Sequence, residues 1–384
     1  MLKRFEVSNY RNFKDKVKVD FSKVGGYQFN SECITNNKIS KMLIYGRNAT
    51  GKTNLGKALL DISNNMARIR FFSSQAVAYL NADSNEKMAL FKYVFQFDDN
   101  EIVYMYHKIS EYQLFDEELL VDGNRVFYFN FETKENDFEG LEELEAETVI
   151  TDRFLQAMNS NKGDDDEAPT LPFLRWVINN TALKENSILL KLDDFINRMA
   201  MVTVGSGGGV YRPRKFYDTF FDALDEKDNL KDFEDFLNIM GIECSLVMKH
   251  LPDGQKELYF QHEKLVPFME TASSGTISLL NLYRRLFMGK NSSLLYMDEF
   301  DAFYHYEMSE NVIRFLKAKY PECQIIMTTH NTNLMTNRLM RPDSLFILSR
   351  RGTLTALCDA TERELREGHN LEKMYISGEF DKYE

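Results

Sequence analysis

The chain has 384 residues, 43% of them hydrophobic, which is enough for one large α/β domain with an insertion or for two domains. Its net charge of −12 repels nucleic acid, so charge gives no support to nucleic-acid binding. No stretch of about 18 or more apolar residues is present, and we expect neither a membrane span nor a secretory signal. Cys33, Cys244, Cys323 and Cys358 form no Cys-x-x-Cys pair, so we expect no zinc site, no disulfides and a cytoplasmic location.

Residues 1–130 predict the first lobe of an α/β domain. The opening part reads strand, loop, strand, glycine-rich loop and helix, with residues 42–45 as a short apolar run typical of a buried strand. Residues 90–97 alternate in polarity, and Asp98-Asp99-Asn100 separates them from a second apolar run at 102–106. This pattern predicts an antiparallel hairpin.

Residues 131–242 predict a mainly helical insertion. Residues 135–170 are acidic and poorly patterned, which indicates a solvated loop. Helical spacing follows at 171–200 and again at 233–240. The glycine-rich run at 205–209 has no Lys-Ser/Thr ending and is interpreted as a flexible link.

Residues 243–384 predict the second lobe. A Pro-Asp-Gly turn joins two strand-like runs at 243–250 and 256–262. Three short apolar runs have the composition of buried strands: 294–297, 324–327 and 345–348. Because strands here alternate with helices, we predict a parallel or mixed sheet. The predicted fold is therefore an α/β nucleotide-binding head assembled from both ends of the chain, with an antiparallel β subdomain and the helical insertion.

Residues 46–53 read Gly-Arg-Asn-Ala-Thr-Gly-Lys-Thr, a complete GxxxxGK[ST] phosphate loop between a predicted strand and a predicted helix. Glycines let the loop curl so that its N–H groups face the phosphates. Lys52 is expected to reach the β- and γ-phosphates and Thr53 to bind Mg²⁺. The predicted nucleotide contacts are Gly46, Arg47, Asn48, Ala49, Thr50, Gly51, Lys52, Thr53 and Asn54.

Two further strands end in residues suited to phosphate chemistry. The run at 294–297 ends in Asp298, predicted to hold Mg²⁺, and Glu299, predicted to orient or deprotonate the attacking water. An acidic turn after a strand is the alternative interpretation. The next strand ends in His330, whose imidazole can donate a hydrogen bond to the γ-phosphate.

The segment Ala272-Ser273-Ser274-Gly275-Thr276 opens a predicted helix just before the acidic strand. Small residues at a helix N-terminus can bind an anion, although an ordinary helix cap has the same sequence.

The order of phosphate loop, Ser-Gly segment, Asp-Glu strand and histidine resembles the ABC ATPase superfamily, and within it the RecF/SMC/OLD branch of stand-alone ATPases. Residues 5–13 are similar to the first strand and the N-[FY]-[RK]-x-F turn of that branch, and residues 298–305 to its Walker B motif and D-loop. The tail at 368–375 resembles the end of bacterial abortive-infection ATPases of the AbiLi and RloA kind, and the ATPase of PARIS-type phage defence is similar.

This resemblance implies an ATP and Mg²⁺ site shared between two copies of the chain. Within one copy it implies catalytic roles for Lys52, Glu299 and His330, and Mg²⁺ ligation by Thr53 and Asp298. It also implies that Ser273 and Gly275 contact the γ-phosphate bound to the other copy, that Asp301 lies at the dimer interface, and that Arg11 contacts phosphate. A dimer or a larger even-numbered assembly follows.

The chain departs from the family pattern in two places. Its signature reads Ala-Ser-Ser-Gly-Thr rather than Leu-Ser-Gly-Gly-Gln, and the Q-loop glutamine is not placed, with Gln75 and Gln96 as candidates. No sustained heptad repeat is present, so we expect no long SMC-type coiled coil. The stretch after His330 is too short for the Toprim nuclease domain of OLD proteins, and we expect any nuclease to be a separate partner.

The functional prediction is an ATPase whose ATP-driven dimerisation gates a partner effector, such as a Toprim-type nuclease, in anti-phage defence. Three alternatives stay open: a RecF-type DNA-repair ATPase, a transporter ATPase, and a nucleotide-bound scaffold without turnover. The repair alternative would bind DNA through Arg338, Arg341, Arg350 and Arg351.

Overall fold

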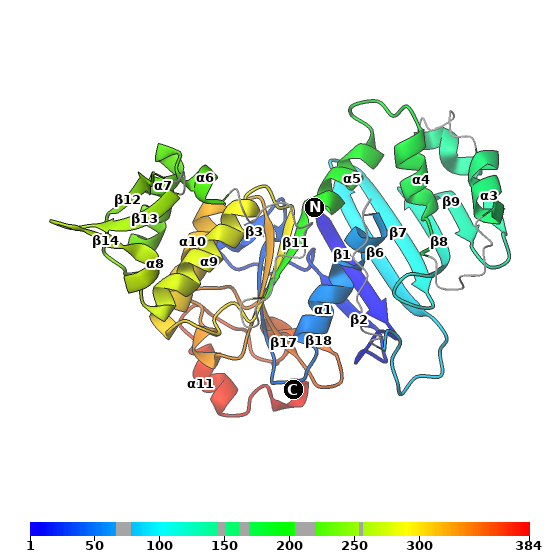
Figure 1. Ribbon diagram of the computed structural model, residues 1–384. Coiled ribbons are helices and arrows are strands. Elements are labelled where there is room, and N and C mark those ends of the chain that lie inside the picture. The colour runs from blue at the N-terminus through cyan, green and yellow to red at the C-terminus, as the bar shows by residue number, and fades with distance from the viewer. Residues whose placement is uncertain (67–77, 145–150, 161–168, 204–219, 253–255) are drawn as a thin grey trace.

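The computed structural model describes the chain except for residues 67–77, 145–150, 161–168, 204–219 and 253–255 (Figure 1). The predicted link at 205–209 and the glutamine candidate Gln75 lie outside the described residues.

A six-stranded sheet occupies the centre of the molecule (Figure 1). Its strands, in spatial order, are β11 (Met199–Thr203), β15 (Leu294–Asp298), β16 (Gln324–Thr329), β5 (Lys41–Tyr45), β17 (Leu345–Leu348) and β18 (Leu354–Ala356). All neighbours pair in parallel except β18, which is antiparallel to β17. Every residue of β5, β15, β16 and β17 is buried, as expected for parallel strands covered on both faces.

Alternate residues of the central strands enter two different cores. On β5, Met42 and Ile44 join the core that contains Leu55 of α1 (Lys52–Leu59), whereas Leu43 faces the opposite core. That opposite core contains Leu280 of α9 (Ser274–Met288) and also α10 (Tyr306–Lys319). Helices α1 and α9 therefore cover opposite faces of the sheet, which follows from the alternation of side chains along a strand.

A second, antiparallel sheet lies over α1. Its strands are β1 (Leu2–Ser8), β2 (Val17–Asp20), β6 (Ala89–Phe97), β7 (Asn100–Lys108), β8 (Leu114–Val121), β9 (Asn124–Asn130) and β10 (Asn136–Asp137), in the order β10-β9-β8-β7-β6-β1-β2. The hairpin predicted around Asp98 is β6–β7, with Phe97 opposite Asn100. The tyrosine hydroxyl of Tyr93 donates to the carbonyl of Ala58 (2.9 Å), which fixes α1 beneath this sheet.

The two sheets are also joined directly. The side-chain amide of Gln324, on β16, accepts from the main-chain N–H of Leu2 (2.8 Å) and donates to its carbonyl (2.9 Å). Both groups are buried, so this pair of bonds satisfies main-chain atoms that β1 exposes at its start.

The middle of the chain is mixed rather than simply helical. Its helices are α3 (Thr151–Ser160), α4 (Phe173–Asn180), α5 (Ile188–Asn197), α6 (Phe220–Leu224) and α7 (Lys227–Ile239). Segment 131–242 also supplies β11, the edge strand of the central sheet. The solvated loop predicted at 135–170 is wrong in part, because it contains α3, whose Phe154 is fully buried among aromatic rings. The division at residues 130 and 242 stays a prediction.

The remaining elements are short. They are α2 (Asp61–Met66), α8 (Phe268–Thr271), α11 (Leu371–Ile376), the paired strands β3 (Ile34–Thr35) and β4 (Lys38–Ile39), the sheet β12 (Leu246–His250), β13 (Lys256–Gln261) and β14 (Leu265–Pro267), and the 3-10 turns Ser31–Cys33, Glu139–Leu144, Thr332–Leu334, Leu357–Asp359 and Asp381–Tyr383. The antiparallel pairing of β12 with β13 confirms the second predicted hairpin. In the described part of the chain, no helix is both long and apolar enough to cross a membrane.

Candidate nucleotide site

The phosphate loop connects the end of β5 to α1, which begins at Lys52. Its curl uses the left-handed backbone region at Ala49 (φ 64°) and Gly51 (φ 101°). A Cβ atom added to Gly51 would lie 2.2 Å from the side-chain nitrogen of Asn12. Backbone conformation and close approach therefore both require glycine at position 51.

Lys52 is buried at the centre of this loop. Its ammonium donates to the carbonyls of Gly46 (2.7 Å) and Arg47 (3.2 Å) and lies 3.0 Å from Nε2 of His330. Burial lowers the pKa of Lys52, and the carboxylates of Glu299 and Asp298 oppose that shift. The structure thus brings the lysine, the acidic pair and the histidine of the sequence prediction together.

Asp298 is the most buried acidic group of the site. It is 1% exposed, its Oδ2 accepts from the hydroxyl of Thr53 (2.6 Å), and its Oδ1 accepts from Thr328 (2.9 Å). Mg²⁺ prefers hard oxygen ligands, and a hydroxyl beside a carboxylate supplies two of them. In nucleotide sites the protein usually provides only a few ligands, and phosphate and water provide the others. The pair Thr53–Asp298 therefore fits a magnesium ion.

Glu299 has an unusual backbone conformation. Its φ of 49° lies in the left-handed region, which costs about 1–2 kcal/mol for a residue with a side chain. The hydroxyl of Thr328 accepts from the Glu299 main-chain N–H (2.8 Å), and the Glu299 carboxylate lies 3.2 Å from Nε2 of His330. The hydroxyl of Thr328 thus contacts the side chain of Asp298 and the backbone of Glu299.

Tyr296 locks the acidic strand to the helix of the phosphate loop. Its buried hydroxyl donates to the carbonyl of Lys52 (2.5 Å). A Cβ atom on Gly56 would lie 2.6 Å from the Tyr296 ring, so only glycine allows this close approach of α1 to β15.

The turn after β1 reaches the loop through Asn12. The Asn12 side-chain amide donates to the carbonyl of Thr50 (3.2 Å) and accepts from the side chain of Asn54 (2.7 Å). Arg11 points elsewhere: its Nε donates to the hydroxyl of Tyr10 (2.9 Å). Among the described residues, Asn12 is thus the member of this turn that lies on the phosphate loop.

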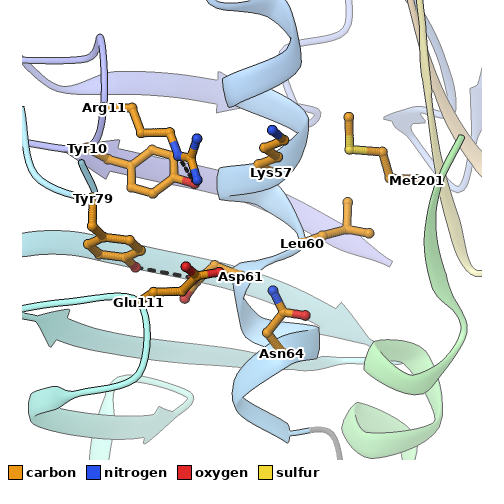
Figure 2. A pocket seen from close by; sticks show the side chains of 9 residues that line it. All are labelled: Tyr10, Arg11, Lys57, Leu60, Asp61, Asn64, Tyr79, Glu111 and Met201. Atoms are coloured by element: carbon orange, nitrogen blue, oxygen red, sulfur yellow. Dashed lines mark hydrogen bonds between the residues drawn. The ribbon is translucent and has the colours of Figure 1, made fainter. Parts of the chain in front are cut away.

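Arg11 lines a separate pocket of about 30 Å³ beside α1, together with Lys57 (Figure 2). At its base, Asp61 is 3% exposed and accepts from Tyr79 (3.2 Å), from Tyr106 (2.8 Å) and from the ammonium of Lys108 (3.0 Å). This buried network anchors α2 to the antiparallel sheet.

The structure does not bring Ser273 and Gly275 to the phosphate loop of their own chain, within the residues it describes. They begin α9, on the face of the central sheet opposite α1, and the Ser273 hydroxyl caps the helix by accepting from the N–H of Thr276 (3.1 Å). Asp301 lies nearer, with a carboxylate that accepts from Thr329 (2.7 Å) and a pKa that burial raises.

Two of the arginines considered for DNA binding are already engaged. Arg341 is 4% exposed and pairs with Asp343 (2.7 Å), while Arg338 pairs with Glu310. Arg350 and Arg351 are exposed.

Gln96, the described candidate for the Q-loop glutamine, lies on β6. Its side chain donates to the carbonyl of Asp98 (2.9 Å).

A family model described as "AAA domain, putative AbiEii toxin, Type IV TA system" matches residues 41–336. The chain belongs to this family. The match begins at β5, so the matched region includes the phosphate loop, the acidic pair and His330, whereas Asn12 lies before it. The predicted relationship to abortive-infection ATPases is thereby confirmed.

A search of curated proteins found no match. Among solved structures, an SMC head bound to the C-terminal winged-helix domain of ScpA is similar with a TM-score of 0.47 and 17% identity, over 92% of this chain and 96% of that one. The SMC head domain from Thermotoga maritima gives 0.44 and 14%, over 92% and 98%. An SMC head with an extended coiled coil bound to the C-terminal domain of ScpA, from Pyrococcus furiosus, gives 0.46 and 15%, over 99% of both chains.

Three residues of this AAA domain and its adjoining turn were not predicted to serve the site: Asn12, Tyr296 and Thr328. The threonine pair at 328–329 directly before His330 is a usable signal, since a hydroxyl at the end of a parallel strand lies at the same sheet edge as Asp298 and Glu299. For Asn12 and Tyr296 no local signal exists, because their partners lie far away in sequence.

We expect Asn12→Ala to weaken nucleotide binding about threefold to tenfold, because one hydrogen bond that shapes the loop is lost. Arg11→Ala is the matched control from the same turn and should have a smaller effect. Isothermal titration with ATP and Mg²⁺ measures both. A larger loss for Arg11→Ala would contradict the assignment of Asn12.

Proposed function

We propose that this chain binds ATP with Mg²⁺ and hydrolyses it. The observation that carries the proposal is the convergence of Lys52, Thr53, Asp298, Glu299 and His330 at one edge of the central sheet, with the contacts given above. Thr53 and Asp298 would hold Mg²⁺, which would offset the negative charge of the phosphates. Glu299 would orient or deprotonate water, and His330 would donate to the γ-phosphate.

We further propose that the site is completed by a second copy of the chain. Helix α9 packs on the opposite face of the sheet from α1, and among the described residues the N-terminus of α9 forms no hydrogen bond or ion pair with its own phosphate loop. Ser273 is exposed in the single copy, which is required of a group that contacts a partner. Two large apolar side chains close in sequence to Ser273 and Asp301 are also exposed, Met269 (52%) and Phe303 (53%).

The hydrolysis proposal predicts different defects for two variants. Lys52→Ala should lose ATP binding, because the ammonium beside the loop is removed. Glu299→Gln should retain binding but lower kcat about 100-fold to 10,000-fold, the range for loss of a general base. Phosphate release and nucleotide titration measure both. Full turnover by Glu299→Gln would assign the general base to another residue, whereas ATP binding without turnover by the wild type would make the protein a nucleotide-bound scaffold.

The composite site predicts complementation between two inactive variants. Lys52→Ala and Ser273→Arg should each abolish turnover alone, whereas a mixed dimer contains one intact site built from Lys52 of one copy and Ser273 of the other. Equal mixing should restore up to about one quarter of the wild-type rate. Glu299→Gln mixed with Lys52→Ala is the negative control, because both defects then lie in residues that act within one copy. Absence of rescue would refute a shared site.

We propose, finally, that ATP-dependent association gates a separate effector, such as a Toprim-type nuclease, in anti-phage defence. The resemblance of the tail to abortive-infection ATPases supports this proposal, and so does a family description that names a toxin.

Phage should form fewer plaques on cells that express the chain with its neighbouring genes, and Lys52→Ala should abolish this protection. Protection that survives Lys52→Ala would show that defence does not depend on ATP binding by this chain.

A further inference from the structure

Arg47, the second residue of the phosphate loop, forms an ion pair with a residue at the far end of the sequence. Its guanidinium lies 2.5 Å from the carboxylate of Glu384. The Glu384 side chain is only 13% exposed, whereas that of Arg47 is 56% exposed. The main-chain N–H of Arg350, just after β17, donates to the main-chain oxygen of Glu384 (3.4 Å) and holds it beside the loop.

The tail segment, residues 371–384, makes a second contact on the other side of Gly46. Tyr375 of α11 packs edge-on against Tyr45, the last residue of β5, with ring centroids 4.8 Å apart. Leu371 and Phe380 of the tail segment are fully buried in the core under this face of the sheet. The tail segment is therefore anchored independently and touches the residues directly before and after Gly46.

The main chain of Arg47 also takes part in the hydrogen bonds within the phosphate loop. Its main-chain carbonyl accepts from the ammonium of Lys52 (3.2 Å) and from the hydroxyl of Thr50 (3.0 Å). Holding the Arg47 side chain therefore restrains the carbonyl to which two other loop residues bond. No other part of the phosphate loop forms an ion pair among the described residues.

We propose that Glu384 is a positioning residue for nucleotide binding: through Arg47 it orders the phosphate loop in advance, so that docking of the tail segment and binding of ATP strengthen each other. This inference rests on the proposed ATP site. Ordering a loop before the ligand arrives removes part of the entropic cost of binding. An ion pair with one exposed partner contributes up to about 1 kcal/mol, which corresponds to about fivefold in affinity.

The test is a double-mutant cycle on the full chain, with ATP and Mg²⁺ titrated calorimetrically. Glu384→Gln and Arg47→Gln should each weaken binding about threefold to fivefold, and the double variant should be no weaker than Arg47→Gln, because both changes break the same contact. Glu379→Gln is the matched control: it removes a tail contact with Thr361 (2.7 Å) and one with Arg363 (3.5 Å), but none with the loop. It should leave the affinity unchanged.

A second readout separates positioning from simple stability. Coupling is reciprocal, so ATP should slow amide hydrogen exchange in the tail segment of the wild type, and this protection should disappear in Arg47→Gln. Unchanged or tighter ATP binding by Glu384→Gln, or additive losses in the double variant, would overturn the proposal while leaving the ATP site intact. A wild-type chain that binds no ATP would instead overturn the proposed function, and this inference with it.

Discussion

The hydrogen bond between Thr53 and Asp298 joins residues 245 positions apart, and the arrangement of the site depends on it. It forms because β5, β16 and β15 run in parallel in adjacent positions, with Tyr45 opposite Thr329. Parallel strands place their carboxyl ends at one edge of the sheet, where ligands of open α/β sheets bind. The phosphate loop, the acidic pair and the histidine each lie at the end of one of these three strands, so the sheet register brings them together and the Thr53–Asp298 hydrogen bond joins two of them.

The same sheet supports the proposal that a second copy of the chain completes the site. Side chains alternate between the two faces of each strand, and the faces are covered by different helices. Helix α1 occupies one face, with the antiparallel sheet above it, and α9 occupies the other. In the proposed dimer, the N-terminus of α9 contacts the phosphate loop of the other copy, because α9 and α1 lie on opposite faces of the sheet within one copy.

Two non-glycine residues of the site adopt the left-handed backbone region. Ala49 and Glu299 both have positive φ, and the Glu299 backbone is tied to the hydroxyl of Thr328. Strained residues persist only where the surroundings fix them. The hydroxyl of Tyr296 holds the start of α1 through the carbonyl of Lys52. Asn12, in the turn after β1, donates to the loop carbonyl of Thr50, and Glu384 contacts Arg47 near the start of the loop. Three distant segments thus restrain one short loop.

The sequence by itself determined the features that depend on local conformation. The phosphate loop is recognisable because its glycines, lysine and threonine act within eight consecutive residues, and the β6–β7 hairpin because alternation and a turn lie side by side. Tertiary structure alone decided that β11 joins the central sheet, that Asn12 rather than Arg11 lies on the loop, and that Arg341 is buried where it donates to the carbonyl of Gly25. Each of these depends on which strands pair and which faces are covered, and such long-range pairing leaves no periodic trace in the residues themselves.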